Sequence, residues 1–189
     1  MNQLILTATD RQGLYTVDYD LKDSLEFEQV EWHKDLGFNN RLTAHTITDT
    51  GLKQLLNTVY EQQYTLLDEL WKDDYFKNHL WAGTTWQQMQ KHTRPFVELN
   101  KDLKGFRTGI HVDHRRAVAV GMLFLNKETL VEQSSVFYKD ELGKDPISMP
   151  TGWAQGWYTA NTHMSWHRGL NMSRDARYSI KFGVYLHMD

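Results

Sequence analysis

The chain contains no cysteine among its 189 residues. This absence excludes disulfide bonds, metal sites built on thiolates and a cysteine nucleophile. Any metal ion must therefore be held by histidine, aspartate or glutamate. Long apolar runs are also missing, and a mean hydropathy of −0.62 gives no segment suited to cross a membrane. The first residues contain no basic leader with an apolar core, so we expect a cytoplasmic protein without a membrane partner.

The chain also lacks a strong net charge. It carries 21 lysine and arginine residues against 24 aspartate and glutamate residues, which gives a formal net charge of −3. This balance provides no global attraction to nucleic acid, so we do not favour nucleic acid as a partner. The local run His114-Arg115-Arg116 leaves contact with phosphate open, although a solvated loop is the simpler interpretation.

Internal repeats, low-complexity segments and shifts in composition are absent as well. A chain of 189 residues falls in the size range of one domain and is long enough to bury a core. We therefore expect a single domain over residues 1–189. Its N-terminal strands and helices would occupy 1–105, and a barrel core that carries the candidate site would occupy 106–189. The sequence indicates no oligomeric state.

Periodicity in the first half predicts short strands followed by helices. Apolar residues at intervals of three and four predict a helix over Gly51–Lys72, and a second helix over Thr85–Leu103 with Pro95 as a break or kink. Before these helices, three segments rich in β-forming residues are predicted as strands. They are Gln3–Thr7, Gly13–Tyr19 and Leu25–Trp32.

The second half reads as β structure. Ala117–Leu125 is an apolar run with β-branched members, and Arg177–Leu186 alternates between two kinds of residue. Arg177 and Ser179 face one side of the latter strand, whereas the apolar residues that follow at alternate positions face the other. Because the apolar face packs on a core, we expect the face with the arginine and serine to line a cavity.

Three residues in this half form a candidate metal site. Residues two apart in a strand project to the same side, so His111 and Asp113 can reach one ion. His167, brought alongside from a distant strand, is the candidate for a third ligand. Two histidines and a carboxylate are the set that holds Fe(II) on one face and leaves positions open for oxygen chemistry. Each residue alone is weak evidence, because surface or hydrogen-bonded histidines are common.

Two other histidines compete for the metal. His163 would be followed, eleven residues later, by Arg174, but Ala176 then has no hydroxyl to accompany that arginine. His114 would point to the opposite face of a regular strand from Asp113. His167 therefore remains the preferred ligand.

The order of these motifs resembles the Fe(II)/2-oxoglutarate-dependent dioxygenases. It consists of the HxD pair, a hydrophobic strand ending in Leu125-Asn126, a distal histidine and, ten residues later, Arg-x-Ser. The resemblance covers about residues 106–186. It implies a mainly β fold with flanking helices around a double-stranded β-helix, which is a jelly-roll or cupin-like core.

The resemblance also implies roles for five residues. His111, Asp113 and His167 would bind Fe(II), while Arg177 would pair with the distal carboxylate of the co-substrate 2-oxoglutarate and Ser179 would add a hydrogen bond. A guanidinium suits this task because it offers parallel donors and stays charged when desolvated. With O2, such an enzyme hydroxylates a C–H bond of a small-molecule or peptidyl substrate and releases succinate and CO2. No catalytic group beyond the metal ligands is implied.

The chain departs from the family after its hydrophobic strand. Many members carry a Gly-Gly-Glu-Leu-like element there, which is replaced here by Lys127–Leu130 and a longer segment. That segment, up to residue 160, contains Trp153, Trp157 and Tyr158. These rings would form either a lid over the substrate or the packing of a long loop onto the barrel.

Two other functions remain open. The chain would be a metal-free jelly-roll binding or structural module if His111 and His167 were incidental, or a cupin-type metal isomerase or lyase if the metal performed no oxidation. Neither class needs a carboxylate clamp, so Arg177 and Ser179 favour the dioxygenase. The sequence does not identify the primary substrate.

Overall fold

The computed structural model describes residues 3–21, 25–127 and 133–187, and its strands form two antiparallel sheets. The larger sheet contains β1 (Leu4–Ala8), β2 (Leu14–Tyr19), β3 (Val30–Lys34), β4 (Arg41–Ile47), β5 (Thr93–Asp102), β7 (Ala117–Phe124), β10 (Gln155–Ala160) and β12 (Arg177–Leu186). The smaller sheet contains β6 (Phe106–Arg107), β8 (Gln133–Tyr138), β9 (Ile147–Met149) and β11 (Trp166–Asn171). Their orders are β1-β2-β10-β7-β12-β5-β4-β3 and β6-β11-β8-β9.

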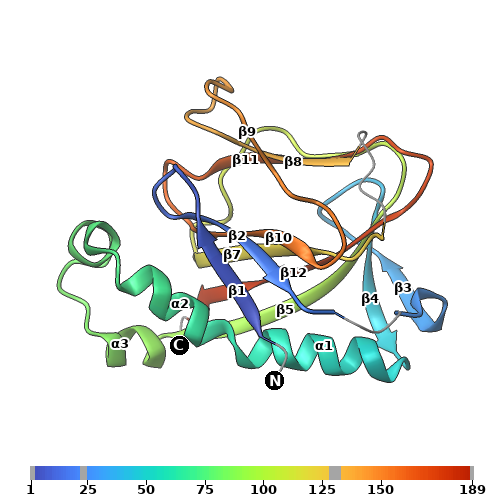
Figure 1. Ribbon diagram of the computed structural model, residues 1–189, viewed down its shortest axis with the longest axis horizontal. Helices are drawn as coiled ribbons and strands as arrows, with labels where there is room; N and C mark the ends of the chain where they lie inside the picture. The colour runs from blue at the N-terminus through green and yellow to red at the C-terminus, as the bar shows by residue number, and fades with distance from the viewer. Residues whose placement is uncertain (1–2, 22–24, 128–132, 188–189) are drawn as a thin grey trace.

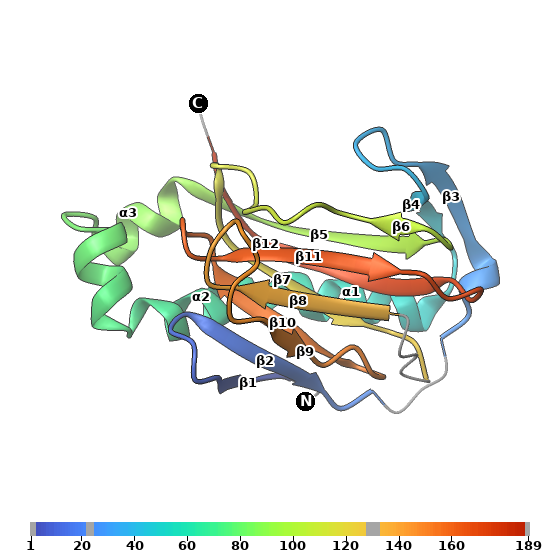
Figure 2. The same ribbon diagram turned by 90° about the horizontal axis from the view of Figure 1, so that it is seen from above.

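Helices cover one face of the larger sheet, and the smaller sheet faces the other (Figure 1). The α-helices are α1 (Thr50–Glu61), α2 (Gln63–Trp71) and α3 (Trp86–Lys91). Two shorter turns are a 3-10 helix at Phe27–Gln29 and a π-helix at Phe76–Leu80. Figure 2 shows β8 and β11 above the larger sheet, and residues of both sheets line one cavity.

The predicted helix over Gly51–Lys72 is present as two helices that meet at Gln62. The carboxylate of Asp49 caps the first by accepting from the N–H of Leu52 at 2.7 Å. The apolar face of α1 and α2 packs on the outward side chains of β12 in the main core. Its fully buried members are Leu52, Leu55, Val59, Leu66, Leu67 and Leu70.

The predicted helix over Thr85–Leu103 is wrong beyond Lys91. Residues from Thr93 onward form β5, which pairs with β12 along its whole length, from Thr93 opposite Leu186 to Asp102 opposite Arg177. Ten residues of strand pairing outweigh the weak helical spacing of the apolar residues. Pro95 fits because β4 pairs with β5 only from residue 100 onward, which leaves an open edge where no N–H is required.

The two strands predicted in the second half of the chain agree well with the structure. Arg177–Leu186 is β12 with the predicted bounds, and its apolar face belongs to the main core. Ala117–Phe124 forms β7, and all eight of its residues are buried. The predicted strand over Leu25–Trp32 is only partly present, because it begins as a 3-10 turn and Val30 starts the strand.

Among the helices in the described ranges, none is long and apolar enough to cross a membrane.

The helix-to-sheet core predicts a large effect of a buried truncation. Leu67 is fully buried under the sheet, so Leu67→Ala should lower the free energy of unfolding by about 2–5 kcal/mol, because the removed atoms leave a cavity. Leu142 is 76% exposed, and Leu142→Ala should change this free energy by less than about 0.5 kcal/mol. Urea unfolding followed by circular dichroism measures both. Equal midpoints for the two variants would contradict this description of the core.

Candidate functional site

The three candidate ligands converge between the two sheets. His111 and His167 form an isolated antiparallel bridge, in which the N–H of His111 donates to the carbonyl of His167 at 3.0 Å and the reverse bond measures 2.8 Å. Asp113 lies two residues beyond, in the loop before β7. Side-chain donor atoms of the three residues all lie within 4.8 Å of one another. The structure thus places the three side chains together, although His111 and Asp113 are not in one regular strand as expected.

Both histidines are oriented by backbone carbonyls. The Nδ1 of His111 lies 2.9 Å from the carbonyl oxygen of Gly109, and the Nδ1 of His167 lies 2.9 Å from that of Ser165. A carbonyl can only accept, so each Nδ1 carries a hydrogen and donates it, and Nε2 is the nitrogen that remains for a metal. Such contacts are typical of metal-binding histidines, whose second nitrogen is held by the protein. The donor set therefore fits a divalent cation.

Charges around Asp113 favour its ionised form. Its Oδ2 lies 3.5 Å from Nε2 of His167, and its Oδ1 accepts from Nζ of Lys181 at 3.2 Å. Burial acts to raise the pKa of Asp113, but the net shift is downward, and the charge and hydrogen bond of the Lys181 ammonium are the main opposing contribution. Burial also lowers the pKa of His167, which keeps its imidazole neutral at pH 7. A neutral imidazole and an ionised carboxylate are the forms that bind a metal.

The ligands line a cavity of about 50 Å³ that also reaches Arg177. Trp157 in β10 forms part of its wall and donates from Nε1 to the hydroxyl of Ser135 at 2.8 Å. The ring of Phe137 stacks on His167 with centroids 5.1 Å apart. These rings shield the histidine from water.

The aromatic residues of the long segment pack rather than form a lid. Trp157 is 2% exposed, and Tyr158, its neighbour in β10, belongs to the main core on the opposite face. Trp153 packs at the edge of that core and donates to the carbonyl of Leu21 at 3.2 Å. The sequence departs from the family pattern at Lys127–Leu130, and residues 128–130 of this segment lie outside the described residues.

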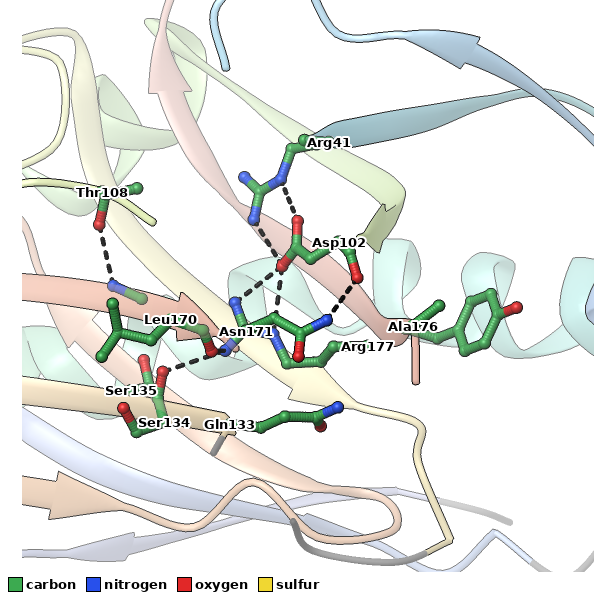
Figure 3. Close-up of polar contacts among 12 residues, drawn as sticks. Arg41, Asp102, Thr108, Gln133, Ser134, Ser135, Leu170, Asn171, Ala176 and Arg177 are labelled. Carbon is green, nitrogen blue, oxygen red and sulfur yellow. Dashed lines mark hydrogen bonds and ion pairs between the residues drawn. The ribbon is translucent and has the colours of Figure 1, made fainter. Parts of the chain in front are cut away.

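Arg177 lies at the other end of the cavity and is 2% exposed (Figure 3). Its Nε and Nη2 donate to Oδ2 of Asp102 at 3.1 and 2.7 Å. Its Nη1 donates to the carbonyls of Ser134 and Leu170 at 3.0 and 2.9 Å. Burial lowers the pKa of Arg177, while Asp102 acts to raise it. The predicted clamp residue is therefore in the cavity but already binds a carboxylate of the protein.

Sequence reasoning missed two residues of this cluster. Arg41 in β4 donates to Oδ1 of Asp102 from Nε at 2.6 Å and to Oδ2 from Nη2 at 3.1 Å. Asp102 at the end of β5 is fully buried, and Arg41 is 6% exposed. The alternation of Glu98, Asn100 and Asp102 with apolar or outward residues is the signal that would have found Asp102, had the segment been interpreted as a strand.

Two buried polar atoms near the arginines lack a partner within the described ranges. They are Oγ of Ser179 and Nδ2 of Asn100, which lie opposite each other in the pairing of β12 with β5. Ser179 shares its strand face with Arg177 and Lys181, as the alternation predicted, but of these three only Arg177 and Lys181 line the cavity. A buried polar group without a partner calls for an explanation, and a bound ligand is one.

The competing histidines lie apart from the site. His163 is exposed in the turn before β11, and His114 is exposed with its Nδ1 accepting from the N–H of Arg116 at 3.3 Å. In the described part of the chain, neither belongs to a group of three or more potential metal ligands. The preference for His167 agrees with this geometry.

No family model matches the chain, and no curated protein matches its sequence. Solved structures do share its fold. A prolyl-4-hydroxylase of Pseudomonas putida aligns over 84% of this chain and 78% of its own, with a TM-score of 0.52 and 12% identity. A putative oxygenase of Shewanella oneidensis aligns over 93% and 82%, with a TM-score of 0.52 and 11% identity.

A third similar structure is a viral collagen prolyl hydroxylase of Paramecium Bursaria Chlorella virus-1 in complex with 2-oxoglutarate. It aligns over 78% of this chain and 80% of its own, with a TM-score of 0.50 and 11% identity. At such identities the likeness concerns the fold, and it confirms the predicted double-stranded β-helix with flanking helices. The chain thus has the fold of known oxygenases, with a His-Asp-His group between its two sheets.

Proposed function

We propose that this protein is an Fe(II)- and 2-oxoglutarate-dependent oxygenase that hydroxylates a C–H bond. The observation that carries the proposal is the convergence of a ring nitrogen from each of two histidines and the Asp113 carboxylate in a cavity that buried arginines also line. Similar folds in proteins named as prolyl hydroxylases and as an oxygenase support it. The two-histidine, one-carboxylate set is the one used by non-haem iron oxygenases.

In this proposal His111, Asp113 and His167 hold the metal. When bound, Fe(II) supplies the activation of O2, with the balance 2-oxoglutarate + O2 + R–H giving succinate + CO2 + R–OH. The protein contributes position and a dry environment rather than acid or base groups. Lys181 fixes one oxygen of Asp113, which leaves the other oxygen directed at His167. Phe137 and Trp157 pack against the His167 ring and exclude water from it.

The arginine end of the cavity is proposed to bind the distal carboxylate of 2-oxoglutarate. Arg177 contributes positive charge there, and the buried hydroxyl of Ser179, two residues along the same strand face and without a partner among the described residues, is the proposed hydrogen-bond donor. A carboxylate buried in this place needs a cation and donors to replace its hydration. The primary substrate would be a small molecule or a peptidyl residue. Two similar structures are named prolyl hydroxylases, so proline-containing peptides belong in a screen for substrate-dependent succinate formation.

The proposal predicts a complex that is visible before any turnover. Anaerobic addition of Fe(II) and then 2-oxoglutarate to the folded protein should produce the weak visible metal-to-ligand charge-transfer band of a chelated 2-oxo acid. Titration of the absorbance gives the affinity. A folded protein that gives no band would contradict the proposal, and would favour a metal-free binding module. A metal-binding protein without the band would instead favour the isomerase or lyase class.

Substitution of the ligands should remove this band selectively. His167→Ala deletes one of three metal donors, so we expect the affinity for Fe(II) to fall by more than about 10-fold and the band to disappear at equal metal concentration. His163→Ala is the matched control, because that histidine is exposed and four residues away. A His167→Ala protein that binds Fe(II) as the wild type does, or a His163→Ala protein that does not, would show that the ligand is misassigned.

A further inference from the structure

The far end of the cavity contains two guanidiniums and only one carboxylate. Arg41, Asp102 and Arg177 come from β4, β5 and β12, and all three are at least nine-tenths buried. Formal charges sum to +1, since two arginines face one aspartate. An uncompensated buried charge is costly, and a ligand carboxylate is the simplest group that would neutralise it. Which arginine can receive that carboxylate depends on the donors that remain.

Arg177 has few donors left. A guanidinium carries five N–H bonds, and Arg177 makes four hydrogen bonds, two to Asp102 and one each to the carbonyls of Ser134 and Leu170. One hydrogen on Nη2 remains. Two parallel N–H bonds are needed to hold a carboxylate bidentately. Arg177 therefore cannot form such a fork without first releasing a contact that it makes within the protein.

Arg41, unlike Arg177, still has two parallel N–H donors that can bind a carboxylate. It uses Nε and one hydrogen of Nη2 for Asp102, which leaves both hydrogens of Nη1 and one of Nη2 without a partner among the described residues. These belong to the end-on edge of the guanidinium, which offers two parallel donors. In Figure 3 the free terminal nitrogen of Arg41 points away from Asp102, on the side where Thr108 lies. Both Arg41 and Thr108 line the cavity that contains the metal ligands.

Neighbouring groups hold the Arg41 guanidinium in place. Its central carbon lies 4.2 Å from the centroid of the Phe106 ring and 5.1 Å from that of Phe38. Both carboxylate oxygens of Asp102 accept hydrogen bonds from the edge of the Arg41 guanidinium that carries Nε and Nη2. A planar cation fixed by rings and by a carboxylate loses little further freedom when it binds a ligand. The site is thus organised before the ligand arrives.

We propose that Arg41 is the residue that binds the distal carboxylate of the 2-oxo acid end-on, and that Asp102 and Arg177 are positioning residues. Asp102 orients Arg41, and Arg177 fixes Asp102 while anchoring it to the smaller sheet through Ser134 and Leu170. This inference rests on the proposed function. It assigns recognition of the co-substrate to β4, which lies outside the segment of about residues 106–186 that resembles the family.

A ligand pair isolates the distal carboxylate. 2-Oxoglutarate and 2-oxopentanoate chelate a metal identically but differ in that a methyl group replaces the carboxylate. Dissociation constants for both come from anaerobic titration of the charge-transfer band on the Fe(II)-loaded full-length protein. The preference is the ratio of the two dissociation constants, and the wild-type protein should bind 2-oxoglutarate more tightly. Arg41→Met should lower this ratio by about 10- to 100-fold, with little change in the dissociation constant of 2-oxopentanoate. This readout requires no turnover.

Arg107→Met is the matched control, because it removes the same charge from an exposed position in β6. It should keep the wild-type preference. If Arg41→Met does not fold, Arg41→Lys keeps a cation beside Asp102 but lacks the fork, and its preference should also fall. A folded Arg41 variant that keeps the wild-type preference overturns this inference but leaves the proposed function intact. A folded wild-type protein that gives the band with neither acid overturns the proposed function, and this inference with it.

Discussion

The arrangement of the cavity depends on the buried carboxylate of Asp102. It accepts four hydrogen bonds from two arginines, and it is fully buried. Without it, Arg41 and Arg177 would be like charges enclosed in a space with little water, a state whose desolvation penalty is several kcal/mol per ion. With it, both remain charged inside the fold. One side chain thereby joins β4 and β12 at the end of β5, and leaves a net positive charge in the cavity.

The metal end of the cavity depends on backbone pairing instead. The reciprocal hydrogen bonds of His111 and His167 join the loop after β6 to the start of β11. This bridge places two rings with centroids 4.5 Å apart, and the carbonyls of Gly109 and Ser165 then fix both rings through their Nδ1 atoms. Asp113 follows two residues later and is held by Lys181 from the floor of the larger sheet. The two ends of the cavity share β12, which carries Arg177, Ser179 and Lys181 on one face.

Local patterns in the sequence predicted the parts of the fold that local forces determine. The clean alternation of Arg177–Leu186 predicted both the bounds of β12 and its two faces, because one face packs on a core. The order of His111, Asp113 and His167 predicted their convergence through resemblance to a family. Thr93–Asp102 was predicted as a helix because Phe96 and Leu99 are three apart. The strand with which it pairs lies about eighty residues away in the sequence, so the short alternation that ends at Asp102 was a weak local signal beside the helical spacing. Arg41 and Asp102 were missed for the same reason, since their contacts are long-range.

The central claim is that one cavity binds a metal at the His-Asp-His end and a dicarboxylate at the arginine end. A crystal structure of the protein grown anaerobically with Mn(II) and 2-oxoglutarate tests both halves together. Anomalous density should place the metal on His111, Asp113 and His167, and the distal carboxylate should lie within hydrogen-bond distance of Nη1 and Nη2 of Arg41. Metal bound elsewhere, or a carboxylate directed away from the arginines, would contradict the account.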